Sequence, residues 1–444
     1  MSNEIRVAFS GKADKKKEVY PLKLHHSGQS DPIIVDVDGN SLLKVSRRIP
    51  NLSEDLLVIA AAVYGADQTV SREAQEDNWK REIAMEIPVR NLEAWEAVSY
   101  ELSNCISFLT GDVWQLRFSE RKKHFVCPRP RQRRLRMPLL QGTAVSLFSG
   151  GLDSLIGAID WLTENKDEQL LLVGHYDGKV GGPSKDQLGL AELCKEKFGR
   201  RFRLSQTRVG ALSGRIETSF RSRSFLFLAQ AAYRAELIGE DTPIIVPENG
   251  PIALNFPLTP ARRGSCSTRT VHPFFLQGIN SVFASVGLQH RISNPYELKT
   301  KGEMVKECLD AEFLKQTFAL SRSCAKMGHK RHWVDRQAGS CGVCVPCLFR
   351  RASLHQMKWD NERFGLRIEN MDSLKSIMDD PLALAAFVRR NDSDRAIATG
   401  LLSNGSLPPG ALNEYVDLVK RMRTEVHGWM RSKGSVYLKG LVGR

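Results

Sequence analysis

The stretch Thr143-Ala-Val-Ser-Leu-Phe148, followed directly by Ser149-Gly-Gly-Leu-Asp-Ser154, decides the fold of this chain. The first six residues are rich in strand formers and predict a buried strand. The next six are small and polar, and helical spacing begins at Leu155. A strand, a tight glycine turn and a helix bring free backbone N–H groups and a helix N-terminus together, so the stretch predicts a phosphate-binding turn.

Each residue type in this turn suits that role. Gly150 and Gly151 lack a Cβ atom, so the backbone can bend sharply and approach an anion closely. Ser149 and Ser154 offer hydroxyl groups, and Ser154 is predicted to be the helix N-cap. Asp153 is the exception, because a carboxylate repels a phosphate. We therefore expect Asp153 to hold Mg²⁺ or to orient the turn.

The pattern Ser-Gly-Gly-x-Asp-Ser is not a Walker A loop, which requires Gly-x-x-x-x-Gly-Lys-Ser/Thr. It resembles the PP-loop of the ATP pyrophosphatases, which split ATP between its α- and β-phosphates and adenylate a carboxylate, carbonyl or amide oxygen. The resemblance implies that the following residues bind ATP: Phe148, Ser149, Gly150, Gly151, Leu152, Asp153 and Ser154.

Composition narrows the class of protein. The 444 residues carry a formal charge of +14 and are 42% hydrophobic, as is usual for a globular protein with two or three domains. No apolar run reaches the ~20 residues that span a membrane, and no signal peptide is evident, so we expect a cytoplasmic protein.

The net positive charge of the chain suits an anionic partner. Much of it lies in residues 121–136, which predict a solvated linker, with a nucleic-acid contact as the alternative.

The chain divides into four predicted parts. These are an N-terminal α+β docking domain with the basic linker (1–137), a PP-loop domain (138–320), a cysteine segment (321–355) and a helical C-terminal region (356–444). In the first part we expect a turn at Asp38-Gly-Asn40 and one helix over residues 92–109.

Strands alternate with helices in the second part and predict a parallel, doubly wound α/β sheet. Predicted strands at 169–174 and 242–247 are each followed by polar residues. His175 follows the first of these strands. Glu248 and Asn249 follow the second, in a stretch to Pro257 whose prolines predict a loop. These positions lie at the carboxyl ends of strands, where such sheets bind ligands.

Two later stretches add candidate residues. Residues 264–273 are polar and hydroxyl-rich and contain Arg269. Thr300 and Glu303 have the spacing of a capping box at a helix start. Lys301 would then lie at the positive end of the helix dipole, a favourable place for a lysine only if an anion such as phosphate binds there.

Four cysteines predict a metal site. Cys341-Gly-Val-Cys-Val-Pro-Cys347 supplies three thiolates from one turn, and Cys324 is the nearest upstream cysteine. His329 or His332 could take the place of Cys324 as the fourth ligand. Four thiolates form a closed tetrahedral site, which favours structural zinc, although an iron–sulfur cluster would use the same ligands. The predicted ligands are Cys324, Cys341, Cys344 and Cys347.

Taken together, these motifs resemble QueC, the 7-cyano-7-deazaguanine synthase family. Arg221-Ser-Arg-Ser-Phe-Leu226, Thr300-Lys-Gly-Glu-Met-Val305 and Cys347-Leu-Phe-Arg350 extend the likeness, which covers residues 140–355. It implies an adenine-nucleotide α-hydrolase-like sheet, ATP, Mg²⁺, zinc and a 7-carboxy-7-deazaguanine substrate. The likeness supports catalysis by Asp153 and Lys301 and substrate binding by Arg221. We also expect nucleotide binding by His175 and substrate binding by Glu248, Asn249 and Arg269, which lie where the chain departs from the QueC motifs.

QueC itself is shorter and lacks the N-terminal part and the helical tail. With these additions the chain is similar to the QatC subfamily of the Qat anti-phage defence system, in which the activated deazaguanine is passed to an amine of a partner protein. Three alternatives stay open. They are nitrile synthesis as in QueC proper, a PP-loop enzyme that modifies tRNA through a cysteine such as Cys194 or Cys266, and a binding module without catalysis.

Overall fold

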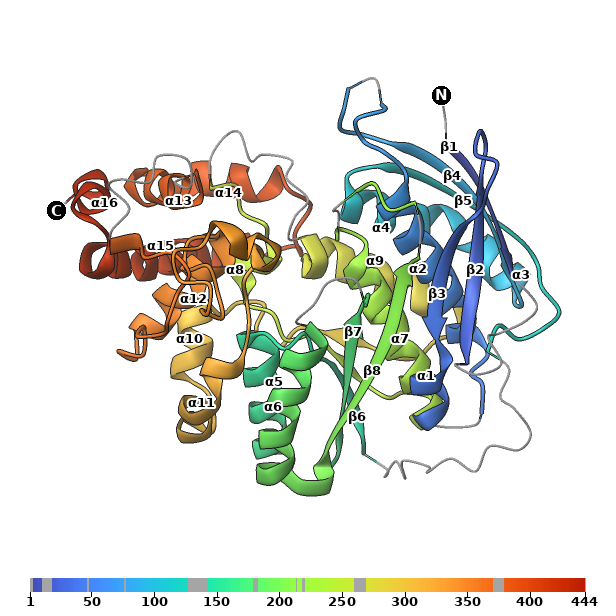
Figure 1. Cartoon of the computed structure of the whole chain (residues 1–444), viewed down its shortest axis with the longest axis horizontal. Coiled ribbons are helices and arrows are strands. Elements are labelled where there is room, and N and C mark those ends of the chain that lie inside the picture. Colours follow the sequence, from blue (N-terminus) through green and yellow to red (C-terminus); the bar gives the residue numbers. More distant parts are fainter. Residues whose placement is uncertain are drawn as a thin grey trace.

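The computed structural model describes residues 3–9, 18–45, 48–75, 77–126, 142–178, 183–212, 214–217, 220–258, 269–369 and 379–443. Within them the chain forms an α/β structure around one sheet of ten strands, in the order β10-β9-β6-β7-β8-β3-β2-β1-β4-β5 (Figure 1). The strands are β1 (Asn3–Phe9), β2 (Val19–His26), β3 (Ile33–Asp38), β4 (Glu82–Val89), β5 (Val113–Glu120), β6 (Ala144–Leu147), β7 (Leu170–Tyr176), β8 (Phe202–Ala211), β9 (Ile244–Ile245) and β10 (Ile292–Ser293).

Helices cover this sheet and extend beyond one end of it. They are α1 (Gly39–Val45), α2 (Leu52–Thr69), α3 (Leu92–Ala97), α4 (Ser99–Thr110), α5 (Leu152–Glu164), α6 (Pro183–Phe198), α7 (Arg223–Ile238), α8 (Gly250–Ala253), α9 (Pro273–Val286), α10 (Lys301–Lys306), α11 (Ala311–Thr317), α12 (Val345–His355), α13 (Asp379–Arg389), α14 (Asp394–Leu402), α15 (Leu412–Lys433) and α16 (Val436–Val442). None of the helices in the described ranges is both long and apolar enough to cross a lipid bilayer.

The middle of the chain builds the parallel half of the sheet. Strands β10, β9, β6, β7 and β8 all run in one direction, with β6 in the centre. The chain moves outward from β6 through β7 to β8 and then returns to add β9 and β10 on the other side. The direction of winding therefore reverses between β6 and β9, and this switch point is where doubly wound sheets bind ligands. The predicted α/β class with a largely parallel sheet is confirmed.

The N-terminal strands continue the same sheet. β3 pairs antiparallel with β8, with Val35 opposite Ala211 and Val37 opposite Val209. Helix α2 packs against both β3 and β8, and against α7. One apolar core therefore includes residues from the N-terminal strands, α2 and α7. The predicted boundary at residue 137 lies outside the described residues.

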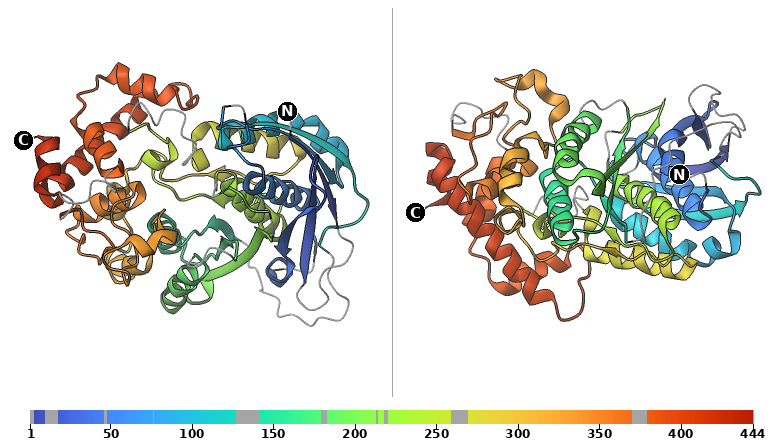
Figure 2. Two further views of the ribbon diagram at one scale, coloured as in Figure 1. Left: turned by 45° about the horizontal axis from the view of Figure 1, so that its top comes forward. Right: turned by 90° about the horizontal axis from the view of Figure 1, so that it is seen from below.

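The C-terminal helices form a second core around the cysteines. Helices α12, α13, α15 and α16 pack together, and the core that they share contains Cys341, Cys344 and Cys347. These helices lie at the end of the molecule opposite the N-terminal strands (Figure 2). The predicted helical character of this region is confirmed.

Three local predictions were wrong. Asp38-Gly-Asn40 does not form an isolated turn, because α1 begins at Gly39 and the Asp38 carboxylate accepts a hydrogen bond from the N–H of Asn40 at 2.9 Å. The helix predicted over 92–109 is two helices, interrupted at Val98, whose ψ of 9° departs from helical geometry. The loop predicted over 247–257 contains the short helix α8, with Pro251 in its first turn.

Candidate functional site

The glycine turn between β6 and α5 is held in place by a neighbouring segment. Gly150 has a φ of +83°, a left-handed conformation that favours glycine. Its carbonyl oxygen accepts a hydrogen bond from the N–H of Arg322 at 2.9 Å. The N–H of Gly151 donates to Ser149 Oγ at 3.2 Å. The turn is therefore fixed both from within and by the segment around Arg322.

The predicted N-cap of α5 was wrong. The helix begins at Leu152, so Gly151 is its N-cap residue and Ser154 is already in the first turn. The Ser154 hydroxyl instead donates to the carbonyl of Gly151 at 3.0 Å and lies 3.2 Å from Ser149 Oγ. Asp153 is the second residue of α5 and lines the neighbouring cavity, whereas Ser154 does not.

Asp153 is the centre of a polar cluster. Its carboxylate is buried, with the residue 5% exposed. Asn249 Nδ2 donates to Asp153 Oδ2 at 2.6 Å, and the Lys301 ammonium forms an ion pair with Asp153 Oδ1. The Glu248 carboxyl also contacts that of Asp153. Four predicted residues from three separate parts of the sequence thus meet at one point.

The charges in this cluster depend on one another. Burial alone would raise the pKa of Asp153, but the Lys301 ammonium and the hydrogen bonds to the carboxylate outweigh burial and lower this pKa. Burial, followed by the negative charge of Asp153, raises the pKa of Glu248 well above its usual value. Glu248 therefore releases its proton less readily than Asp153, and the Lys301 ammonium offsets the negative charge of Asp153.

Helix caps position two members of the cluster. Asn249 is the N-cap of α8, where its Oδ1 accepts from the N–H of Ile252 at 3.2 Å, leaving Nδ2 directed at Asp153. Thr300 and Glu303 form the predicted capping box at the start of α10, which is confirmed. Lys301 is the first residue of this helix.

Helix α15 secures the start of α10 in a way that the sequence did not predict. The Glu425 carboxylate accepts hydrogen bonds from the Thr300 hydroxyl and from the N–H of Gly302, the latter at 3.3 Å. A Cβ atom on Gly302 would lie 2.5 Å from the same carboxylate. No local motif surrounds Glu425, so only the folded chain identifies it as a neighbour of Lys301.

A cavity of about 200 Å³ opens beside the cluster, at the carboxyl ends of β6 and β9. It is lined by Ser149, Gly151, Leu152, Asp153, Pro247, Glu248, Ile252, Lys301, Arg322, Ser323 and Pro346. Sequence reasoning missed Ile252, Arg322, Ser323 and Pro346. The cysteine motif was the available signal for three of them, because Arg322 and Ser323 precede Cys324, and Pro346 lies between Cys344 and Cys347.

His175 lies away from this cavity. It belongs to β7, which is longer than predicted, so the ring is buried in the core. One ring nitrogen contacts the carbonyl of Val209 at 3.0 Å, and the other accepts from Arg223 Nε at 3.2 Å. Burial, followed by the positive charge of Arg223, lowers the pKa of His175 to about 3. The ring is therefore neutral and engaged in packing.

Six further predicted residues also lie outside the cavity lining: Phe148, Gly150, Ser154, Arg221, Asn249 and Arg269. Arg221 Nη1 donates to the carbonyl of Thr110 at 2.8 Å, and Arg269 Nη1 donates to that of Phe108 at 3.0 Å. Both arginines thus bind the last turn of α4, where a cation is favourable. Phe148 is buried against the ring of Phe202, with the ring centroids 6.1 Å apart.

The four cysteines meet as predicted. The Sγ atoms of Cys324, Cys341, Cys344 and Cys347 all lie within 4.8 Å of one another. Cys341 Sγ and Cys347 Sγ are 3.8 Å apart, close to the ~3.8 Å edge of a tetrahedron with Zn–S bonds of ~2.3 Å. The four thiols could therefore hold a metal ion such as zinc, and neither His329 nor His332 is needed as a fourth ligand.

The backbone around the cysteines is also suited to a metal site. The N–H groups of Val343 and Cys344 donate to Cys341 Sγ at 3.4 and 3.3 Å, and the N–H of Cys341 donates to Cys324 Sγ at 3.4 Å. Such bonds stabilise thiolates around a metal. Gly342 has a φ of +83°, and a Cβ atom there would lie 2.7 Å from the carbonyl oxygen of Leu366. The turn therefore requires glycine.

Of the two cysteines considered as nucleophiles, the structure describes only Cys194. Cys194 is fully buried in the apolar core under α6, and burial raises its pKa to about 12. Its thiol therefore stays protonated and out of reach of the cavity. Cys266 lies outside the described residues.

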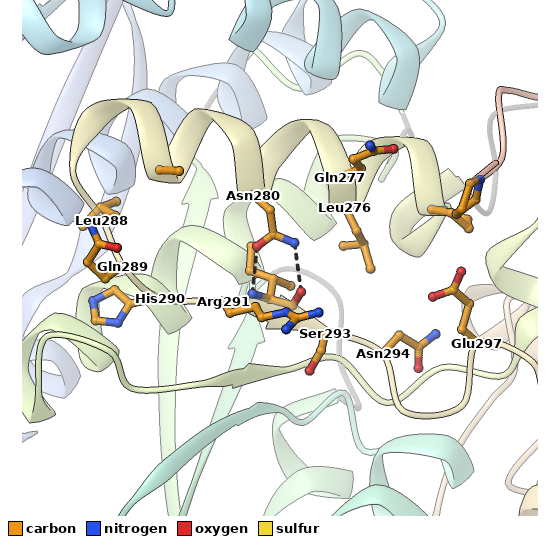
Figure 3. A pocket seen from close by; sticks show the side chains of 14 residues that line it. Leu276, Gln277, Asn280, Leu288, Gln289, His290, Arg291, Ser293, Asn294 and Glu297 are labelled. Carbon is orange, nitrogen blue, oxygen red and sulfur yellow. Dashed lines mark hydrogen bonds between the residues drawn. The ribbon is translucent and has the colours of Figure 1, made fainter.

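A larger cavity, of about 710 Å³, lies between α9 and the edge strand β10 (Figure 3). There the Asn280 amide bonds both to the N–H and to the carbonyl of Ile292, each at 2.9 Å. Asn280 thus occupies backbone groups that an edge strand would otherwise expose. None of the predicted catalytic, nucleotide-binding or metal-binding residues lines this cavity, so we place the candidate site in the smaller one.

No model of a known protein family matches the chain, and no curated protein matches it either. Membership of the QueC-like family therefore stays a prediction from the motifs in residues 140–355.

Proposed function

We propose that this chain is an ATP-dependent enzyme that adenylates a carboxylate, releases pyrophosphate and passes the acyl group to an amine. One observation carries the proposal. Asp153, Glu248 and Lys301 converge on the glycine turn in a cavity at the switch point of the sheet. A glycine turn at a helix N-terminus, a lysine and paired carboxyl groups suit a nucleoside triphosphate and its cation.

Each group has a task in this chemistry. The turn and the N-terminus of α5 would bind phosphate oxygens, while Lys301 and Arg322 line the cavity with positive charge. Asp153 and Glu248 would hold Mg²⁺, whose role when bound is to offset the negative charge of the phosphates. The ion pair between Lys301 and Asp153 also holds the Lys301 side chain in place before the nucleotide binds.

The proposed reaction has two steps. An oxygen of the acid forms a bond to the α-phosphorus of ATP, the bond from that phosphorus to the bridging oxygen breaks, and pyrophosphate leaves with the electron pair. An amine nitrogen then bonds to the carbonyl carbon, the bond to AMP breaks, and the amine loses a proton. The cavity supplies position and electrostatic stabilisation, which dominate catalysis of this type.

The resemblance to QueC-like proteins supports a narrower version of this proposal. The acid would be 7-carboxy-7-deazaguanine, and the acceptor would be an amine of a partner protein in the same anti-phage defence system. The cysteine group would hold zinc as a structural ion, because its four thiolates leave no open position.

Pyrophosphate release from ATP in the presence of 7-carboxy-7-deazaguanine tests this function. Removing a preorganised electrostatic group typically lowers kcat by ~10²–10³, so we expect a loss of this size in Asp153→Ala and in Lys301→Met. Lys299→Met is the matched control, because Lys299 is partly exposed and pairs with Glu307 outside the cavity. Unchanged release by Asp153→Ala and Lys301→Met would contradict the proposal.

A further inference from the structure

A second cavity, of about 400 Å³, lies next to the candidate site. It is lined by Pro251, Ile252, Asn255, Phe256, Pro257, Leu258, Ala325, Lys326, Cys344, Val345, Pro346, Phe349, Asp380 and Met422. Ile252 and Pro346 line both cavities. A ligand that extends past these two side chains would therefore occupy both spaces at once.

The two cavities differ in chemistry. The smaller one contains Lys301 and Arg322, which suit an anion. The larger one has walls of Phe256, Phe349 and Met422, which are respectively 9%, 7% and 2% exposed. Such a space favours a flat apolar body over a phosphate.

One carboxylate, that of Asp380, lines the apolar cavity. Asp380, at the start of α13, is 9% exposed and forms an ion pair with Lys326, whose Nζ lies 3.5 Å from Asp380 Oδ2. Lys326 is itself tied to the cysteine group, since its N–H donates to Cys324 Sγ at 3.4 Å. A buried carboxylate is an acceptor for N–H groups on the edge of a ring.

We propose that this cavity binds the body of the acid substrate, a flat nitrogen heteroaromatic ring with N–H donors facing Asp380. The carboxylate of the acid would then point past Ile252 and Pro346 toward Lys301. The inference rests on the proposed function and extends it by placing the second substrate. The adenine of ATP is a poorer occupant, because nucleotides lie across the carboxyl ends of strands, and Ser149 and Pro247, which follow β6 and β9, line the smaller cavity but not this one.

Calorimetric titration of the full chain measures the affinity for the acid and the affinity for the nucleotide separately. The acid probe is 7-carboxy-7-deazaguanine, added in the presence of α,β-methylene-ATP, and the nucleotide analogue is also titrated alone. Because a hydrogen bond to a charged group contributes strongly, we expect Asp380→Asn to weaken acid binding by about 10- to 100-fold and to leave nucleotide binding unchanged. Asp379→Asn, the exposed neighbour in the same helix turn, is the matched control and should change neither.

A second variant keeps the test decisive if Asp380→Asn does not fold. Phe349→Leu removes an aromatic wall and should weaken acid binding without affecting the nucleotide. Unchanged acid binding in the folded variants, or a loss of nucleotide binding in step with the acid, would overturn the inference. Failure of the unaltered chain to bind the nucleotide analogue would instead contradict the proposed function itself.

Discussion

At the scale of single residues, the arrangement of Lys301 depends on side chains remote in sequence. Thr300 and Glu303 were predictable, because a capping box is a local pattern. Glu425 was not, because nothing in its own helix marks it as the partner of Thr300. The position of Glu248 after a strand was predictable, but its contact with Asp153, which raises the pKa of Glu248, required the folded geometry.

Glu425 predicts a pH dependence of stability. Burial, followed in effect by the nearby carboxylate of Glu303, raises the pKa of Glu425 from 4.5 to about 7, although hydrogen bonds from Thr300 and Gly302 and the charge of Arg421 oppose the shift. The folded chain thus binds this proton more tightly than the unfolded chain. The free energy of unfolding should therefore fall as pH rises from about 4.5 to 7, by about 3 kcal/mol from this group.

Urea unfolding between pH 4.5 and 8 measures this contribution. Glu425→Gln keeps an oxygen that can accept from Thr300 and Gly302 but cannot ionise. We expect the variant to lose less stability than the unaltered chain over this range. Equal slopes for the two proteins would show that Glu425 does not carry the shifted pKa.

At the scale of elements, short segments around the cysteine motif line the smaller cavity. The cysteine turn leads into α12 and carries Pro346, and the segment before Cys324 carries Arg322 and Ser323. Most strands and long helices were predictable from periodicity. The short helix α8 was not, because its four residues, Gly250–Ala253, are too few to show helical periodicity, although Asn249 and Pro251 mark its start.

Loss of the metal site should therefore affect both folding and the cavity. We expect Cys344→Ser to lose bound metal, to lower the free energy of unfolding by about 4 kcal/mol or more, and to abolish pyrophosphate release. Metal analysis, thermal unfolding and the release assay measure these effects. Cys308→Ala is the matched control, since Cys308 is buried but belongs to another core. A stable, metal-replete and active Cys344→Ser protein would rule out the structural role.

At the scale of the whole molecule, one sheet brings the site together. Asp153 follows β6, Glu248 and Asn249 follow β9, and these strands are neighbours at the switch point. The alternation of strands and helices predicted the sheet but not the pairing of β3 with β8, which joins segments far apart in the chain. His175 was misplaced for a related reason, because β7 continues alongside β8 to Tyr176.

Exchange of radiolabelled pyrophosphate into ATP decides whether this chain activates an acid at the switch point. We predict exchange that requires 7-carboxy-7-deazaguanine, occurs without an acceptor amine and falls by ~10²-fold or more in Lys301→Met. Absence of exchange in the folded, metal-bound chain, or equal exchange in Lys301→Met, would contradict acyl adenylation at this cavity.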